Sequence, residues 1–322
     1  MRIITVGRND AGQRLDKFLQ KAVKGLPTSM MYKLIRQKKI KLNRKRAEQN
    51  VILREGDEIQ LFIREEFFDS PERDDSALAR IRPKLEIVYE DENIMLLNKR
   101  PGVLVHEDTA ATENTLVLHV KAYLYQKGEY DPASEQSFAP ALCNRIDRNT
   151  GGIVIAAKNA EALRVMNEKI RENQLTKCYF CLVHGTPSKR EATLTGYLRK
   201  NAAQNLVEVR DRPFEGAKNI ITKYRVLESR GDRSLLEVEL VTGRTHQIRA
   251  HMAHIGHPLL GDGKYGVNRN EKREGFKYQA LYAYRLSFDK TKTEKSLSYL
   301  EGKTFALDRD AIWFLREGRY DG

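Results

Sequence analysis

The segment Asn144–Gly152 contains an aspartate whose neighbours favour an ionised carboxylate. It reads Asn-Arg-Ile-Asp-Arg-Asn-Thr-Gly-Gly, so Asp147 lies between Arg145 and Arg148, and the apolar run 153–157 follows directly. Adjacent cations favour the charged form of a carboxyl group, which can then act as a nucleophile or a base. From these residues alone, an Asp–Arg pair that caps a turn is the favoured interpretation, and a reactive carboxylate is the alternative.

Four histidines in one twelve-residue window form a second group of interest: His246, His251, His254 and His257. The i, i+3 spacing of His251 and His254 could begin a metal site on a helix. However, no cysteine lies nearby, the only acid in the vicinity is Asp262, and His257 follows the predicted end of the helix. We therefore expect histidines on the surface and at the end of a helix, and no metal ion.

A strongly basic run near the N-terminus is the third feature. The net charge is +13, of which residues 1–64 contribute +10, residues 65–82 −3 and residues 83–322 +6. Eight cations and no acid lie between positions 33 and 46: Lys33, Arg36, Lys38, Lys39, Lys41, Arg44, Lys45 and Arg46. A solvated face is the alternative interpretation, but a run of this density without acids suits the phosphates of a nucleic acid.

Composition limits the class of protein. The 322 residues are 40% hydrophobic and 31% charged, with a mean hydropathy of −0.60, which is typical of a folded protein with one large core and room for a second domain. No apolar run reaches the ~18 residues of a membrane span, and the N-terminal apolar run is too short for a signal peptide. We expect a cytoplasmic protein without membrane contact, whose cysteines (Cys143, Cys178 and Cys181) are reduced thiols.

The elements that must position these groups fall into two predicted domains. In residues 1–64, apolar spacing indicates a helix over 12–25, a second helix after Ser29, and strands from Ile40 and over 59–63. Residues 65–82 lack convincing periodicity and are interpreted as a linker. Residues 83–322 are predicted to form an α+β domain with a mostly antiparallel, mixed sheet. Its expected strands are 86–89, 94–99, 153–157, 177–184, 220–226 and 235–242. Its expected helices are one capped by Asn159 and one over 245–255.

Residues 1–64 resemble the small RNA-binding domain named after ribosomal protein S-four. The similarity lies in Gln13–Leu19, in the helix before Ile40, in Ile40–Asn43 and in the turn Glu55–Asp57. The order and spacing of these elements carry the resemblance, since each is weak alone. It implies that the basic run contacts RNA.

Residues 85 to about 290 resemble the RluA-type pseudouridine synthases. The family signature, close to His-Arg-Leu-Asp-Arg-Asp-Thr-Ser-Gly before an aliphatic strand, keeps its Arg-x-Asp-Arg-x-Thr-x-Gly frame here. This chain departs from it at Asn144, Ile146, Asn149 and Gly151, so no role is transferred from the family's His, second Asp and Ser. Three further blocks match: 97–106, 177–179, and 242–252 continuing through 256–262.

The resemblance implies isomerisation of uridine in RNA to its C-glycoside without cofactor, metal or ATP. It implies that Asp147 is the nucleophile, that Tyr179 stacks on the target base, and that Arg249 keeps Asp147 ionised. Four further residues are expected to bind the substrate: Arg145, Arg148, Arg244 and His246. Arg145 is expected to fill the gap left by the flipped nucleotide. The chemistry is consistent with this set, because a base must leave its stack before its glycosidic bond can react, and an aromatic face and cations can hold it.

The substrate implied by the S-four-like domain is large-subunit ribosomal RNA, with transfer RNA as the alternative, and we expect a monomer. Two other classes of function compete. One is a ribosome-assembly factor that only binds RNA, and the other is a zinc-dependent RNA hydrolase or deaminase built on the histidines. The intact set of Asp147, Tyr179 and Arg249 favours the synthase over the binding-only factor. Elemental analysis of the purified protein would test the zinc enzyme.

Overall fold

The computed structural model describes residues 1–68, 76–106, 114–201, 206–266, 271, 273–290 and 296–316. The chain divides into two compact units. The first consists of residues 1–84, 118–141 and 157–163, and the second of residues 85–117, 142–156 and 164–322. The predicted domain boundaries at 64 and 83 stay predictions.

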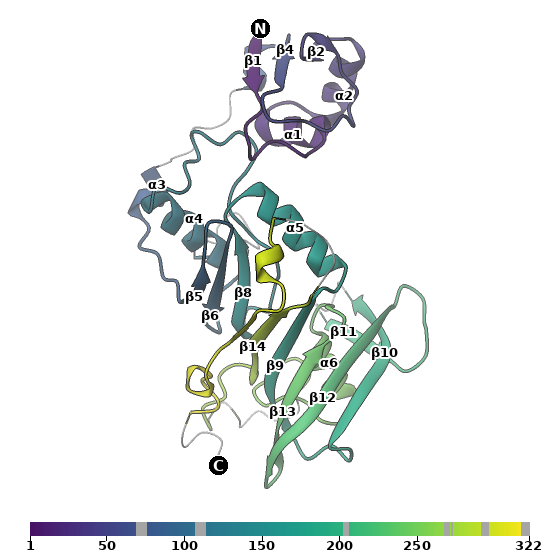
Figure 1. Cartoon of the computed structure of the whole chain (residues 1–322). Helices are drawn as coiled ribbons and strands as arrows, with labels where there is room; N and C mark the ends of the chain where they lie inside the picture. The colour runs from purple at the N-terminus through teal and green to yellow at the C-terminus, as the bar shows by residue number, and fades with distance from the viewer. Residues whose placement is uncertain are drawn as a thin grey trace. The chain divides into compact units, whose positions relative to one another are not determined.

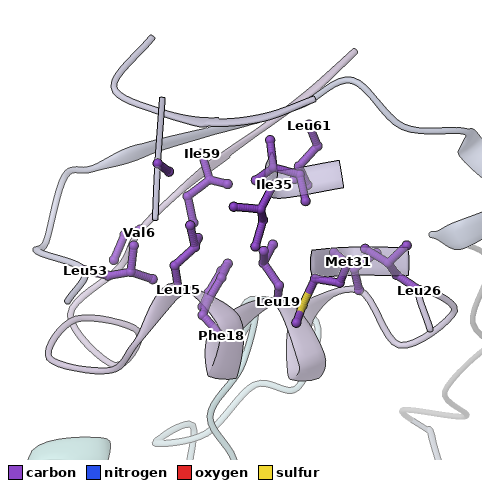
Figure 2. Packing of buried hydrophobic residues seen from close by; sticks show 13 residues of the cluster. Val6, Leu15, Phe18, Leu19, Leu26, Met31, Ile35, Leu53, Ile59 and Leu61 are labelled. Carbon is purple, nitrogen blue, oxygen red and sulfur yellow. The ribbon is translucent and has the colours of Figure 1, made fainter. Parts of the chain in front are cut away.

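The first unit contains a four-stranded antiparallel sheet and two helices. Its strands are ordered β1 (Arg2–Thr5), β4 (Glu58–Leu61), β2 (Ile40–Leu42) and β3 (Lys45–Arg46), and its helices are α1 (Leu15–Ala22) and α2 (Thr28–Arg36). Figure 2 shows how Phe18 and Leu19 of α1 and Ile35 of α2 pack toward Ile59 and Leu61 of β4, which are fully or almost fully buried. The apolar helical spacing in the sequence therefore predicted the core-facing side of both helices correctly.

The segment interpreted as an aperiodic linker is partly regular. It contains a 3-10 turn over Glu65–Phe67 and the short helix α3 over Ser76–Arg80, while 69–75 lie outside the described residues. A helix of this length has too few positions to show a period in the sequence.

The second unit is built on one large sheet, seen face-on in Figure 1. Its strand order is β11-β10-β12-β13-β9-β14-β8-β6-β5, with β15 paired to β14 and β7 paired to β8. Where the register is defined, the pairs are antiparallel except for the parallel pair of β14 and β8. The predicted α+β class with a mostly antiparallel, mixed sheet is confirmed. The strands are β5 (Ile87–Glu90), β6 (Ile94–Lys99), β7 (Ala141–Leu142), β8 (Gly151–Ala157), β9 (Leu175–His184), β10 (Glu191–Asn201), β11 (Leu206–Arg210), β12 (Lys218–Arg230), β13 (Arg233–Leu240), β14 (Leu281–Phe288) and β15 (Thr304–Ala306).

The remaining helices are α4 (Leu116–Gln126), α5 (Ala160–Arg171) and α6 (Gln247–His254), and 3-10 turns lie near the C-terminus at Ser298–Leu300 and Arg309–Ala311. Asn159 caps α5 as predicted, because its side-chain oxygen accepts the N–H of Ala162 at 2.8 Å. The predicted start of α6 at 245 is wrong by two residues, since His246 has φ 52° and breaks the helical path. Helix α4 and the strands β10, β11 and β14 were not predicted from the sequence. Among the described residues, no helix is long and apolar enough to cross a bilayer, and the three cysteines are free thiols, as expected.

Two glycines at the start of β8 let this strand lie against β14. A Cβ on Gly151 would lie 2.2 Å from the ring of Tyr282, and a Cβ on Gly152 would lie 2.2 Å from the carbonyl oxygen of Ala283. Gly152 also has φ +114°. The glycine at position 151, where the RluA-type signature has serine, therefore has a packing reason.

Gly152→Ala is expected to destabilise the protein by at least about 3 kcal/mol, because the added Cβ meets backbone in an unfavourable conformation. Gly231→Ala is the matched control, since Gly231 also has a positive φ (+56°) but nothing lies within 4 Å of its Cβ position. It should cost only about 1 kcal/mol. Urea denaturation of both variants measures the difference, and equal losses would contradict the packing argument.

Candidate active site

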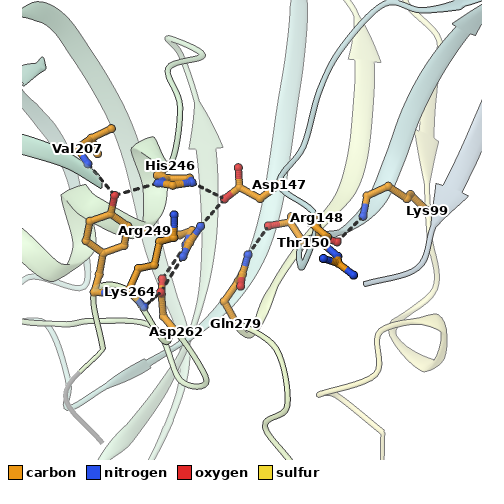
Figure 3. A network of polar contacts seen from close by, with 11 residues as sticks. Lys99, Asp147, Arg148, Thr150, Val207, His246, Arg249, Asp262, Lys264 and Gln279 are labelled. Carbon is orange, nitrogen blue, oxygen red and sulfur yellow. Dashed lines mark hydrogen bonds and ion pairs between the residues drawn. The ribbon is translucent and has the colours of Figure 1, made fainter. Parts of the chain in front are cut away.

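Asp147 lies on the loop between β7 and β8, four residues before the buried strand β8 begins. Its side chain is 26% exposed and accepts a charge-assisted hydrogen bond from Arg249, with 2.6 Å between Arg249 Nη1 and Asp147 Oδ2 (Figure 3). Arg249 comes from α6, 102 residues further along the chain. The carboxylate is therefore paired with a cation yet open to solvent, which is the state a nucleophile requires.

A second carboxylate fixes the guanidinium group of Arg249. Asp262, whose side chain is fully buried, accepts hydrogen bonds from Arg249 Nε at 2.7 Å and from Nη2 at 2.8 Å, and the backbone N–H groups of Lys264 and Tyr265 also donate to it. Burial alone would lower the pKa of Arg249, but the hydrogen bonds and charges of Asp262 and Asp147 outweigh it and raise that pKa. Burial likewise opposes ionisation of Asp262, yet Arg249 and the two N–H groups hold its pKa below the ordinary value. Arg249 thus stays charged and bridges both carboxylates.

His246 lies near the same oxygen of Asp147 at a longer distance (Figure 3). Its Nε2 lies 3.9 Å from Asp147 Oδ2, and its Nδ1 lies 2.9 Å from the hydroxyl of Tyr265. That hydroxyl also accepts the N–H of Val207 at 3.0 Å. In the tautomer in which the hydroxyl donates to Nδ1, a neutral His246 carries its proton on Nε2, toward Asp147. Burial lowers the pKa of His246 despite the charge of Asp147, which favours this neutral form.

Tyr179 is the aromatic residue of the site. It lies on β9 between Val238 of β13 and Ala283 of β14, is 6% exposed, and lines the same cavity as Asp147. Its hydroxyl makes no hydrogen bond to any residue that the structure describes. Burial, and then the charges of Asp147 and Cys178, raise the pKa of Tyr179, so it keeps its proton and can donate it to a ligand.

These groups line a cavity of about 1320 Å³. Among the described residues of its lining, Asp147 is the only acid, and the cations number nine: Arg145, Arg148, Arg171, Lys177, Lys200, Arg244, Arg249, Lys264 and Lys277. A cavity of this charge attracts an anionic ligand.

The structure brings the seven residues proposed from the sequence as catalytic or substrate-binding to this one cavity: Asp147, Tyr179, Arg249, Arg145, Arg148, Arg244 and His246. Arg145, Arg148 and Arg244 are exposed. The eight cations of the basic run belong to the first unit, where all are exposed except Lys41, which is partly buried beside the ring of Phe62. Arg249 lies in the interior, where Asp262 pairs with it.

Sequence reasoning missed several groups that support the site. Asp262 and Lys99 lie inside matched blocks, which was the available signal, but no role was assigned to them. Lys99 is buried and donates to the carbonyls of Arg100, Val103 and Arg148, at 3.1, 2.9 and 2.9 Å. Burial lowers the pKa of Lys99 to about 7, against the opposing charge of Asp147. Lys99 therefore ties the peptide next to Asp147 to the end of β6.

The four clustered histidines contact different partners and do not converge. Besides His246, His251 Nδ1 lies 3.0 Å from Thr222 Oγ1, His254 pairs with Asp211, and His257 bonds the carbonyl of His184. The expectation that these histidines are on the helix surface is wrong for His251, which is 1% exposed. That ring faces the sheet, a side that helical spacing alone did not identify.

The buried state of His251 predicts a pH-dependent stability. Burial, followed by the charge of His254, lowers its pKa to about 4. Below about pH 6.5 the unfolded chain therefore takes up a proton that the native protein does not, and the free energy of unfolding falls. Between pH 7 and pH 5 the wild type should lose about 2 kcal/mol more than His251→Gln, measured by urea denaturation. Parallel losses in the two proteins would contradict a neutral buried His251.

Comparison with known proteins gives consistent matches. The family model described as RNA pseudouridylate synthase matches residues 93–254, and the S4 domain model matches residues 13–59. An uncharacterized RNA pseudouridine synthase of Mycoplasma genitalium is 34% identical over 300 residues, covering 90% of each chain. The ribosomal large subunit pseudouridine synthase C of Escherichia coli is 33% identical over 272 residues, covering 83% of this chain and 80% of its own. The human RNA pseudouridylate synthase domain containing 1 shares the fold, with a TM-score of 0.53 and 24% identity over 73% of this chain and 96% of its own.

Proposed function

The chain belongs to the RNA pseudouridylate synthase family and has an S4 domain, and on that premise we propose that it isomerises specific uridines of large-subunit ribosomal RNA, with Asp147 as the nucleophile and without a cofactor. One observation carries the proposal: the only described acid in the cationic cavity is a solvent-accessible aspartate held by a buried arginine. Relatives named ribosomal large subunit pseudouridine synthase C support the choice of RNA.

The reaction balances without a co-reactant. The bond from C1′ of the sugar to N1 of uracil breaks, a bond from C1′ to C5 forms, and the proton lost from C5 is matched by one gained at N1. Asp147 adds to the sugar or to the base and is released at the end, so the carboxylate is regenerated. Arg249 stabilises that carboxylate whenever it is free, at 2.6 Å.

Tyr179 and the cavity cations hold the substrate. The ring of Tyr179 gives the extruded base a surface to stack on, and its protonated hydroxyl can donate to a base carbonyl. Arg145 is exposed at the same cavity and fills the gap left in the RNA, while Arg148, Arg244 and His246 contact the backbone around the target nucleotide.

The decisive experiment maps pseudouridines in ribosomal and transfer RNA from a strain lacking the gene. Loss of one or a few pseudouridines from large-subunit ribosomal RNA, restored by the wild-type gene and not by Asp147→Asn, is the expected result. If pseudouridines are lost only from transfer RNA, then transfer RNA is the substrate and not ribosomal RNA. An unchanged map would contradict the proposal. Restoration by Asp147→Asn would contradict the role of the aspartate.

We also propose that the basic run is the RNA-binding surface of the S4 domain. None of its eight cations forms an ion pair with an acid among the described residues. Replacing Arg36, Lys39 and Arg44 by Gln should reduce the slope of log affinity against log salt by ~0.7 to 0.9 for each lost phosphate contact.

The matched control removes three cations that are paired with glutamates in the second unit: Lys223→Gln, Arg225→Gln and Arg309→Gln. It changes the net charge equally, so a general effect of charge would lower both slopes. If the basic-run variant and the wild type have equal salt slopes with large-subunit ribosomal RNA, the run is only a solvated face.

A further inference from the structure

Lys177 lines the cavity but has no role in the mechanism above. It lies on β9 two positions before Tyr179, so both side chains leave the same face of the strand, about 6.6 Å apart along it. Both residues line the cavity that contains Asp147. The strand thus presents an aromatic ring and a cation to one ligand.

The ammonium group of Lys177 has no partner among the described residues, unlike those of the buried lysines. Lys99 donates to three carbonyls, and Lys158 and Lys169 each pair with a glutamate. Lys177 is partly buried, yet it makes no hydrogen bond or ion pair with any residue in the described part of the chain. Burial lowers its pKa with no carboxylate opposing the effect. Holding this cation costs the fold free energy unless an anion enters.

The space beside this ammonium group is open to the cavity. A Cβ at Gly243 would lie 3.9 Å from Lys177 Nζ and would meet no other heavy atom within 4 Å. Gly243 is exposed and lines the same cavity. A ligand in the cavity can therefore reach this ammonium group.

The geometry points to Lys177 as the residue that binds a phosphate flanking the target uridine, while Tyr179 contacts the base. The inference rests on the proposed function, because RNA is the ligand that brings an anion into this cavity. A phosphodiester offers the charge and acceptor oxygens that an ammonium group binds. An extruded nucleotide keeps its flanking phosphates, so a contact at one of them fixes its position relative to Asp147.

The test uses the full-length protein and a synthetic RNA stem-loop that contains a uridine mapped as above. Three versions are compared: unmodified RNA, and RNA with a neutral methylphosphonate on the 5′ or on the 3′ side of that uridine. Lys177→Met should weaken binding of unmodified RNA about tenfold or more. One of the two methylphosphonates should weaken binding to the wild type by a similar factor and have no further effect on Lys177→Met.

Lys223→Met is the matched control, since Lys223 is a strand lysine paired with Glu239 and absent from the cavity lining. It should bind all three RNAs as the wild type does. Lys177→Arg should stay within about threefold of the wild type in affinity and in single-turnover rate, because a guanidinium group also binds phosphate.

Three outcomes would overturn the assignment. If neither methylphosphonate weakens binding to the wild type, a phosphate contact is excluded. This comparison uses only the wild-type protein, so it does not depend on the folding of a variant. Additive losses of the variant and the methylphosphonate would show that the two do not interact. Lys177→Arg that binds RNA normally but fails in single turnover would make the lysine a proton acceptor instead, because arginine does not deprotonate. Absence of pseudouridine with the wild type would contradict the proposed function, not this inference.

Discussion

Asp147→Asn is expected to abolish pseudouridine formation, lowering the single-turnover rate by at least about 10⁴-fold, the scale observed when a covalent nucleophile is removed. The amide has the shape of the carboxylate and still accepts a hydrogen bond from Arg249, so affinity for RNA should change by less than about threefold. Tritium release from RNA labelled at C5 of uridine measures the turnover, and filter binding measures the affinity.

The matched control for this change is Asp211→Asn. Asp211 is 84% exposed and pairs with His254 outside the cavity lining, so its amide variant should keep wild-type turnover. Residual turnover of Asp147→Asn within about tenfold of the wild type would show that another group attacks the nucleotide.

Arg249→Met is expected to damage both activity and stability. Asp147 loses the cation that donates a hydrogen bond to it and fixes its position, which should reduce the rate about 100-fold or more. Asp262 is left with a buried, unpaired charge, which should cost about 3 to 5 kcal/mol of folding free energy. Urea denaturation and single-turnover tritium release measure the two effects separately.

A double variant separates the two contributions. Arg249→Met combined with Asp262→Asn removes the buried charge as well, so it should recover much of the stability but none of the activity. Recovery of activity with stability would mean that Arg249 acts only through folding. A rate within about threefold of the wild type, ~0.65 kcal/mol in the barrier, would show that the pair with Asp147 is unimportant.

Local elements and motif residues could be predicted from the sequence. The spacing of Leu15, Phe18 and Leu19 identified α1 and its buried face, and Asn159 identified the start of α5, because side-chain periodicity and capping are properties of neighbouring residues. The block Asn144–Gly152 identified the candidate nucleophile, since its frame of arginines, aspartate and glycine matches a family signature.

Apart from the pairing of Arg249 with Asp147, which the family resemblance implied, the partners of the site residues could not be predicted in this way. Helical spacing placed His251 at the surface, whereas it is buried, and gave no sign that Asp262 pairs with Arg249. The reason is that the sheet and the turn at Asp262 cover α6 on sides that its own sequence does not reveal. The left-handed conformation of His246 at the start of α6 was likewise not predicted, because glycine is the residue that commonly adopts it.

The sequence by itself therefore determined the family, the local elements and the chemical types of the site residues. Only the tertiary structure decided that Arg249 also binds Asp262, and that Lys177 faces the cavity without a partner among the described residues. The physical reason is that secondary structure depends on neighbours within a few positions, whereas burial and charge pairing depend on side chains that meet only when distant segments pack. Asp147 and Arg249 are 102 residues apart, and no local pattern encodes their 2.6 Å contact.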